Sequence, residues 1–120
     1  MKDNTIVMAY LNELESAVLL AMCERETSEP NALAIQVKNA EVTSRKNTGS
    51  GFYTYLKVDP SCITLKQEIL SNIFVDVIGL NNPMTFILFV QDGYIFMLEG
   101  ASIEDNTVNI DFQNVEFRVL

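Results

Sequence analysis

Hydrophobic residues recur every three or four positions near the start of the chain. They are Val7, Leu11, Leu14, Val18 and Met22. The polar residues between them fall mostly off this stripe, so the pattern predicts an amphipathic helix from about Thr5 to Glu26. Either Asp3 or Asn4 is expected to cap the first turn. Pro30 is expected to end the helix, because proline disfavours helical backbone in the residue before it.

Beyond the predicted helix the spacing of apolar residues changes to two. The alternation predicts a strand from Leu33 to about Val42, with a bulge where the phase slips after Asn39. The polar stretch Thr43–Ser50 predicts a loop. Alternation resumes over Phe52–Val58, which predicts a second strand.

The strongest pattern in the second half of the chain is a hairpin. Two apolar, β-prone runs, Phe86–Gln91 and Tyr94–Glu99, flank Asp92-Gly93, and both turn residues tolerate the positive φ that a tight turn requires. Before this hairpin, Thr64–Leu70 predicts a short helix and Asn72–Leu80 a buried strand.

A last strand pair is predicted from Val108 to Phe112 and from Val115 to Val119. One leading helix followed by five or six mostly antiparallel strands predicts an α+β fold, in which the helix packs on one face of a curved sheet. At 120 residues, with neither an internal repeat nor a linker-like segment, the chain is expected to form a single domain over residues 1–120.

The net charge of the chain limits the classes of molecule that it is expected to bind. The chain has 16 acidic and eight basic residues and a formal charge of −8. Residues 71–120 hold one basic residue, Arg118, against seven acids, which are Asp76, Asp92, Glu99, Glu104, Asp105, Asp111 and Glu116. This sign repels phosphates, so a nucleic acid is not an expected partner, whereas a basic protein is. The open alternative is that the acids only keep a hydrophobic domain in solution.

The commonest catalytic base and the usual catalytic motifs are missing. There is no histidine, so Ser–His and Cys–His pairs are excluded, and the chain has no Walker loop, no GxSxG and no CxxC. Glu99 is an acid whose pKa desolvation would raise, but a solvated or arginine-paired role is simpler. The sequence predicts a non-enzymatic protein without a cofactor or metal.

Two cysteines and the lengths of the apolar runs bear on the cellular compartment. Cys23 and Cys62 are expected to be free thiols of a reducing compartment, although a disulfide between them stays open. The longest apolar runs are far shorter than the roughly 20 residues of a membrane-spanning helix. The amino terminus also lacks the features of a secretory signal. A soluble, cytoplasmic protein that does not contact membranes is therefore expected.

Two interpretations apply to Gly49-Ser50-Gly51. The backbone amides of this segment could form an anion-binding nest, with Arg45 and Lys46 nearby. Turn geometry is the simpler explanation, since glycines beside a strand commonly supply positive φ or allow a close backbone approach.

Three strings resemble a pattern found in small bacterial proteins of uncharacterised function. These strings are SRKNTGSGFYT at 44–54, FVQDG at 89–93 and LEG at 98–100, matching Arg-x-x-Thr-Gly-x-Gly-Phe, Phe-x-x-Asp-Gly and Leu-Glu-Gly. Some such small acidic proteins are encoded beside polymorphic toxins, so the resemblance implies immunity to a toxin.

The resemblance also implies roles for individual residues. One loop would be shaped by Arg45, Thr48, Gly49, Gly51 and Phe52. The hairpin would be shaped by Asp92, Gly93 and Glu99. If Arg45 reached Glu99 across neighbouring strands, the two would form a salt bridge that pins the loop.

The function expected from the sequence is that of a non-enzymatic acidic binding protein, which neutralises a basic toxin domain as an immunity protein. The expected contact residues are Asp92, Glu99, Glu104, Asp105, Tyr53 and Tyr55. Ordinary strand packing is the alternative role of the tyrosines. Two other functions stay open, which are a small-ligand-binding or enzymatic protein with a pocket between helix and sheet, and a structural homo-oligomer that pairs through a sheet edge.

Overall fold

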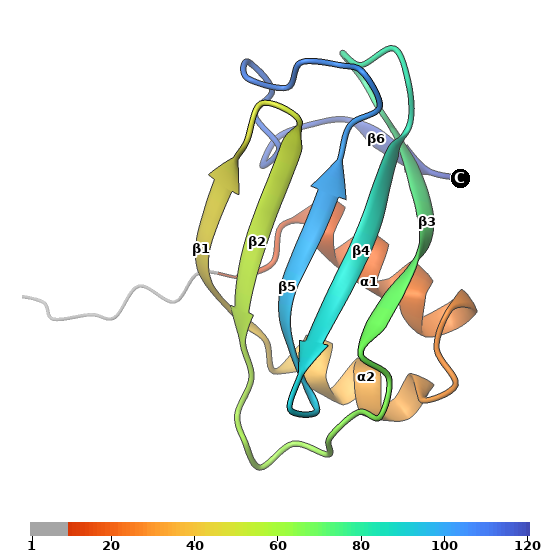
Figure 1. The fold of residues 1–120 in the computed structure, drawn as a ribbon, viewed down its shortest axis with the longest axis vertical. Helices are drawn as coiled ribbons and strands as arrows, with labels where there is room; N and C mark the ends of the chain where they lie inside the picture. The colour runs from red at the N-terminus through yellow and green to blue at the C-terminus, as the bar shows by residue number, and fades with distance from the viewer. Residues whose placement is uncertain (1–9) are drawn as a thin grey trace, which may run out of the picture.

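The computed structural model describes residues 10–120. Its elements in chain order are α1 (Glu13–Arg25), α2 (Pro30–Lys38), β1 (Glu41–Asn47), β2 (Gly51–Lys57), β3 (Ile69–Val77), β4 (Met84–Gln91), β5 (Tyr94–Ala101) and β6 (Phe117–Val119). The strands form one antiparallel sheet in the order β1-β2-β5-β4-β3-β6. Both helices lie on the same face of this sheet (Figure 1). The predicted α+β fold is confirmed.

Helix α1 begins later than its hydrophobic stripe predicts. The Asn12 side chain accepts a hydrogen bond from the Glu15 amide at 2.8 Å, and the Glu15 carboxylate accepts one from the Asn12 amide at 2.9 Å. This reciprocal capping box fixes the first turn, so residues 10–12 are not helical and the predicted continuous helix from Thr5 is wrong. The predicted caps Asp3 and Asn4 lie outside the described residues.

The strand predicted from Leu33 is wrong, because the segment forms helix α2. Pro30 does not end a helix but occupies the first turn of this one, where its missing N–H costs nothing. Leu33 and Gln36 are both fully buried. Residues three apart share one face of a helix but lie on opposite faces of a strand, so the burial of both residues fits a helix. The Gln36 amide nitrogen donates to the carbonyls of Ile63 and Gly93, each at 2.8 Å, and its oxygen accepts from the Ile95 amide.

The predicted loop at Thr43–Ser50 is also wrong over most of its length, because β1 extends to Asn47. This strand lies at the edge of the sheet and only Val42 is fully buried, which explains why its sequence is polar. A bulge interrupts its register with β2 between Val42 and Ser44, slightly beyond the predicted position.

The central hairpin is confirmed as β4 and β5, with Asp92 at φ 53° and Gly93 at φ 89°. The strand predicted before it forms as β3, but β3 already begins at Ile69, so the short helix predicted over Thr64–Leu70 is wrong.

The last predicted strand pair is half wrong. Only β6 forms, and it pairs with β3 rather than with residues 108–112. Residues 102–116 instead cross one end of the sheet as an irregular connection (Figure 1).

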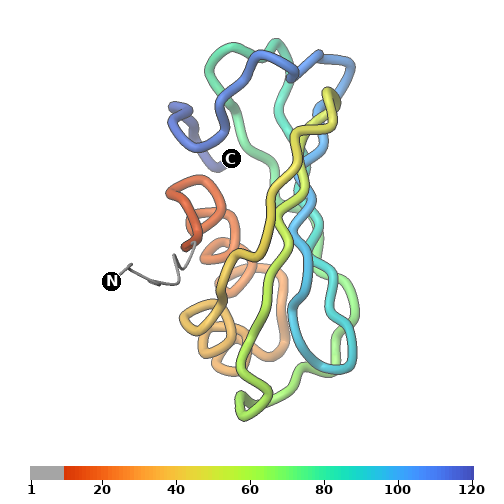
Figure 2. Tube along the Cα trace, turned by 90° about the vertical axis from the view of Figure 1, so that its left-hand side faces the viewer, coloured from red at the N-terminus to blue at the C-terminus, as the bar shows by residue number. Residues whose placement is uncertain are grey.

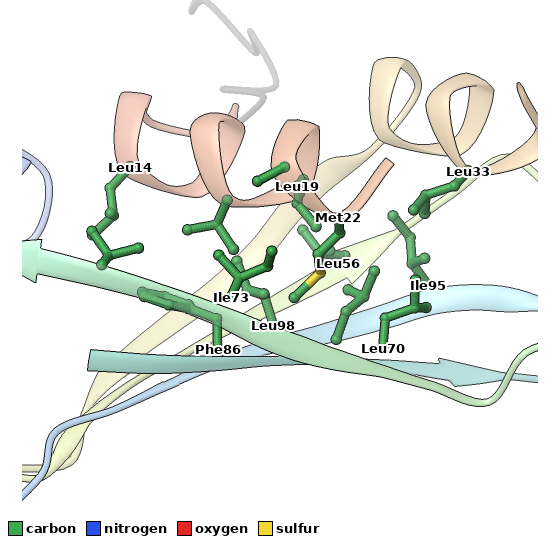
Figure 3. Close-up of a cluster of buried hydrophobic side chains, with 14 of the residues drawn as sticks. Leu14, Leu19, Met22, Leu33, Leu56, Leu70, Ile73, Phe86, Ile95 and Leu98 are labelled. Atoms are coloured by element: carbon green, nitrogen blue, oxygen red, sulfur yellow. The ribbon is translucent and has the colours of Figure 1, made fainter. Parts of the chain in front are cut away.

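The core lies between the two helices and the sheet. Figure 3 shows Leu14, Leu19 and Met22 of α1 directed toward side chains of the inner sheet face. Phe86 and Leu98 from the central strands are fully buried there. Among residues 10–120, neither helix is long and apolar enough to cross a bilayer.

Candidate functional site

The strand register separates the side chains of the sheet into two faces. One row runs Tyr53, Glu99, Ile87 across β2, β5 and β4, and the next row runs Tyr55, Met97, Phe89 across the same strands. Residues that alternate with these rows, such as Leu98, are buried against the helices. The rows therefore lie on the face that points away from the helices, which we call the outer face.

The outer face carries a continuous set of large apolar side chains. They are Tyr53, Tyr55, Ile69, Phe74, Ile87, Phe89, Phe96 and Met97. The Tyr53 and Tyr55 rings lie 6.3 Å apart between centroids, as do those of Phe89 and Phe96.

This apolar surface is open. Tyr55, Phe74 and Ile69 are 39%, 42% and 57% exposed. No element of residues 10–120 covers the outer face, as the edge-on view shows (Figure 2). Contiguous exposed apolar surface of this kind commonly marks an interaction site.

The outer face is electrically neutral although the chain is strongly acidic. Its charged residues are Glu41, Asp76 and Glu99 together with Lys46, Lys57 and Arg118. Residues 10–120 contain 15 acidic and seven basic residues, and removing these three of each sign leaves twelve acids and four bases elsewhere. The whole net charge of −8 therefore lies off the outer face.

Tyr53 and Glu99 lie opposite each other on β2 and β5. The negative charge of Glu99 raises the pKa of the Tyr53 phenol above its ordinary value, with smaller contributions from burial, from a hydrogen bond to Glu99 and from Tyr55. Two of the residues expected to contact a partner, one aromatic and one acidic, are thus direct neighbours.

Arg45 does not reach Glu99, and the salt bridge considered between them is wrong. Arg45 lies on the inner face, where its Nε and Nη2 atoms donate to the two carboxylate oxygens of Glu15 at 2.9 and 2.8 Å. Glu15 is fully buried and also accepts a hydrogen bond from the Thr54 hydroxyl. This bond to Glu15 raises the pKa of the Arg45 guanidinium, against the effect of burial.

The β1–β2 turn is held by the connection that crosses the end of the sheet. The Gly51 amide donates to the Thr107 hydroxyl at 2.9 Å, and the Thr107 amide donates to the Gly49 carbonyl at 2.9 Å. Gly49 and Ser50 donate their amides to the side chains of Asn47 and Thr48. Because these three amides already have partners within the protein, the geometry of the segment is that of a braced turn rather than of an anion-binding nest.

Two glycines of the sequence pattern, Gly51 and Gly100, meet in space. A Cβ atom on Gly51 would lie 1.9 Å from the carbonyl oxygen of Gly100, and one on Gly100 would lie 2.6 Å from Phe86 and 2.9 Å from Phe52. The Thr-Gly-x-Gly-Phe and Leu-Glu-Gly strings therefore specify a close approach of β2 to β5. Packing between β2 and β5 therefore explains why Gly51, Phe52 and Gly100 occur in these strings.

The acids expected to contact a partner do not form one patch. Asp92 lies at the tip of the β4–β5 hairpin, at the opposite end of the sheet from Glu104 and Asp105 (Figure 1). Asp105 accepts hydrogen bonds from the amides of Asn81 and Asn82 at 3.2 and 3.0 Å, so it holds two connections together.

One end of the sheet is nevertheless rich in acids. Residues 102–116 contain no basic residue and four acidic ones, which are Glu104, Asp105, Asp111 and Glu116. We call this connection the acidic end. Glu104, Asp111 and Glu116 are exposed.

A small cleft adjoins the pair of Arg45 and Glu15. Its volume is about 170 Å³, and Asn12, Lys46 and Phe112 also line it. The Asn12 Nδ2 atom is buried and, within residues 10–120, has no hydrogen-bond partner. The cleft is smaller than most ligand pockets, which measure about 300 to 1,000 Å³.

Among residues 10–120, no group of three or more histidine, cysteine, aspartate and glutamate side chains is arranged to hold a metal ion. Cys23 and Cys62 are free and partly buried. Burial, and to a smaller extent the charge of Glu24, raises the pKa of the Cys23 thiol.

Several residues that organise the molecule were missed from the sequence. By apolar periodicity alone, Glu15 is one of the polar residues that fall off the stripe of α1, although the spacing Asn12-x-x-Glu15 before an apolar run is the pattern of a capping box. Gln36 and Thr107 form hydrogen bonds with residues up to 59 and 60 positions away in the chain, and no local pattern predicts such contacts.

No family model, no curated protein and no solved structure matches the chain.

Proposed function

We propose that this chain is a non-catalytic binding protein of the cytoplasm, whose acidic surface engages a basic protein. The form that we favour is the neutralisation of a basic toxin domain by an immunity protein. The observation that carries the proposal is the separation of charge, because the net charge of −8 lies off the outer face.

The acidic end concentrates part of this charge on one connection. Its four acids have no basic residue in the same segment, and three of them are exposed. Of these three, Asp111 also accepts hydrogen bonds from the Gln113 amide and the Asn114 side chain. Opposite charge accelerates association and orients the encounter, whereas affinity depends on contacts made afterwards. An acidic connection across the end of the sheet therefore suits recognition of a cationic surface.

Catalysis has less support than binding. The most buried carboxylate, Glu15, already accepts hydrogen bonds from Arg45, Thr54 and the Asn12 amide. A group held in this way has no remaining position for a substrate proton. It serves the fold rather than proton transfer.

The test is affinity capture from the source organism at low ionic strength, with wild type and two variants as bait. One variant neutralises the acidic end by Glu104→Gln, Asp111→Asn and Glu116→Gln. The matched control neutralises exposed acids elsewhere by Glu13→Gln, Glu24→Gln and Glu68→Gln.

A basic protein should be retained by wild type and by the control, and the amount retained should fall about tenfold or more with the acidic-end variant or at high salt, because opposite charge speeds association. The proposal fails if no basic protein is retained, or if both variants retain it equally.

Binding of a small ligand is a second candidate, favoured by the Asn12 Nδ2 donor, which belongs to a residue lining the cleft and has no partner within residues 10–120. A ligand with a carbonyl or carboxylate oxygen would satisfy this donor. NMR titration with small carboxylates should then shift the Asn12 side-chain amide signals, and an unchanged spectrum would remove this candidate.

A further inference from the structure

We propose that the outer face is the contact surface of a homodimer, in which it packs against the outer face of a second copy. The proposal goes beyond binding of a basic protein and uses a different surface. It accounts for the open apolar side chains, which neither the helices nor the acidic end explains.

The chemistry of the outer face suits burial. Aromatic residues and methionine are enriched at the centres of protein interfaces, and the face presents five aromatic rings and Met97 on one rigid sheet. Single exposed apolar residues are ordinary, but here they occupy adjacent rows on neighbouring strands. Covering them removes apolar surface from water.

The size of the outer face suits a dimer. Five strands spaced about 4.8 Å apart, with about seven residues each at about 3.4 Å, span about 24 by 24 Å. The flat area is therefore about 580 Å², and the relief of the side chains adds to it. A standard interface buries about 800 Å² on each partner, which is on the same scale.

The balanced charge of the outer face favours a second copy of the chain over a strongly charged protein as the partner. A two-fold interface brings the same patch against itself, so a patch with net charge would repel its mate. The outer face avoids this cost because Glu41, Asp76 and Glu99 balance Lys46, Lys57 and Arg118. The surplus acids lie elsewhere and stay in solvent when the two faces meet.

The resulting arrangement follows known sheet packing. Two facing sheets lie about 10 Å apart with their strands within about 30° of each other, which gives a helix–sheet–sheet–helix particle. Each copy keeps its helices and its acidic end outside. The dimer would present two acidic ends to basic partners.

The test is sedimentation equilibrium of the full chain over a range of concentrations. Wild type should be dimeric at about 0.5 mM and should dissociate on dilution, as expected for an interface of this size. Ile69→Lys, on the outer face, should weaken dimerisation about tenfold or more. The matched control is Ile63→Lys, because Ile63 is 63% exposed in a loop and Ile69 is 57% exposed, and it should leave the dimer unchanged.

Each outcome bears on the proposal. A wild-type monomer at about 0.5 mM overturns it, whether the outer face is then covered by the first nine residues of the chain or by a different protein. Equal weakening by Ile69→Lys and Ile63→Lys also overturns it. Failure of the dimer leaves the capture experiment on the acidic end unaffected, so the two proposals fail separately.

Discussion

Glu15 at the start of α1 and Arg45 in edge strand β1 form a two-point ion pair, with nitrogen–oxygen distances of 2.9 and 2.8 Å. The carboxylate is fully buried, whereas the guanidinium is 22% exposed. The same carboxylate closes the capping box of α1 through the Asn12 amide. One acidic side chain therefore starts the helix and attaches it to the edge of the sheet.

Removing Glu15 should destabilise the fold strongly, because Arg45 and Thr54 then lose their acceptor in a buried setting. Glu15→Ala is expected to lower the free energy of unfolding by about 3 kcal/mol, measured by urea denaturation. The matched control is Glu13→Ala, an exposed residue of the same turn, which should cost less than about 0.5 kcal/mol. Equal effects of the two substitutions would contradict the role of the ion pair.

Alanine substitutions at Gly51 and Gly49 distinguish the cost of backbone strain from the cost of a steric collision. Both have positive φ, at 121° and 85°, but only at Gly51 would a Cβ atom collide with Gly100. Gly49→Ala should therefore cost about 1 kcal/mol from backbone strain alone. Gly51→Ala should cost about 3 kcal/mol or more, because β2 must also move away from β5. Similar losses of stability in urea denaturation would show that the close approach is not required.

Tyr53 should titrate above the ordinary pKa of tyrosine because its phenolate would face Glu99. The stabilising contribution is present below the unfolded pKa of about 10 and is lost as pH rises through the folded value. Ultraviolet difference titration of wild type, with Tyr53→Phe as reference, measures this pKa. Glu99→Gln should lower it, and an unchanged value would exclude the electrostatic cause.

Asp105 should contribute to stability only while it is ionised. Burial acts to raise its pKa, but hydrogen bonds from Asn81 and Asn82 outweigh this effect, so the pKa is lowered. Its contribution is present above the unfolded pKa of about 3.9 and is lost as pH falls through the folded value.

Thermal unfolding of Asp105→Ala tests this dependence. The melting temperature should fall by several degrees at pH 7, and the difference from wild type should shrink toward pH 2. Glu104→Ala, the exposed neighbour, is the control and should change little. A difference that is constant with pH would mean that the carboxylate charge is not what holds the two connections.

The parts of the fold that could be predicted depend on local patterns. The apolar stripe of α1 and the Asp92-Gly93 turn each follow from neighbouring residues alone, and both are present. Helix α2 was missed because Leu33, Ile35 and Val37 alternate like a strand, while the buried Gln36 that reveals the helical face is polar. Edge strand β1 was missed because a strand with one buried residue has no apolar periodicity.

The candidate surfaces required the order of the strands. Tyr53 and Tyr55 fall on one face of β2 by alternation, but their neighbours Glu99 and Met97 follow only from the pairing of β2 with β5. The same pairing places Arg45 on the opposite face from Glu99. Sequence spacing alone therefore predicts which residues share a face of one strand, but not which residues of the neighbouring strand lie beside them.

The central claim is that the outer face meets a second copy. The most direct measurement is methyl NMR of the full chain during dilution from about 0.5 mM to about 0.01 mM, a range chosen to span dissociation of a weak dimer. The Met97 methyl signal, on the outer face, should shift with concentration, whereas that of Met22, which is fully buried between α1 and the sheet, should not. A Met97 signal that is independent of concentration, or equal shifts of both methyl groups, would contradict the claim.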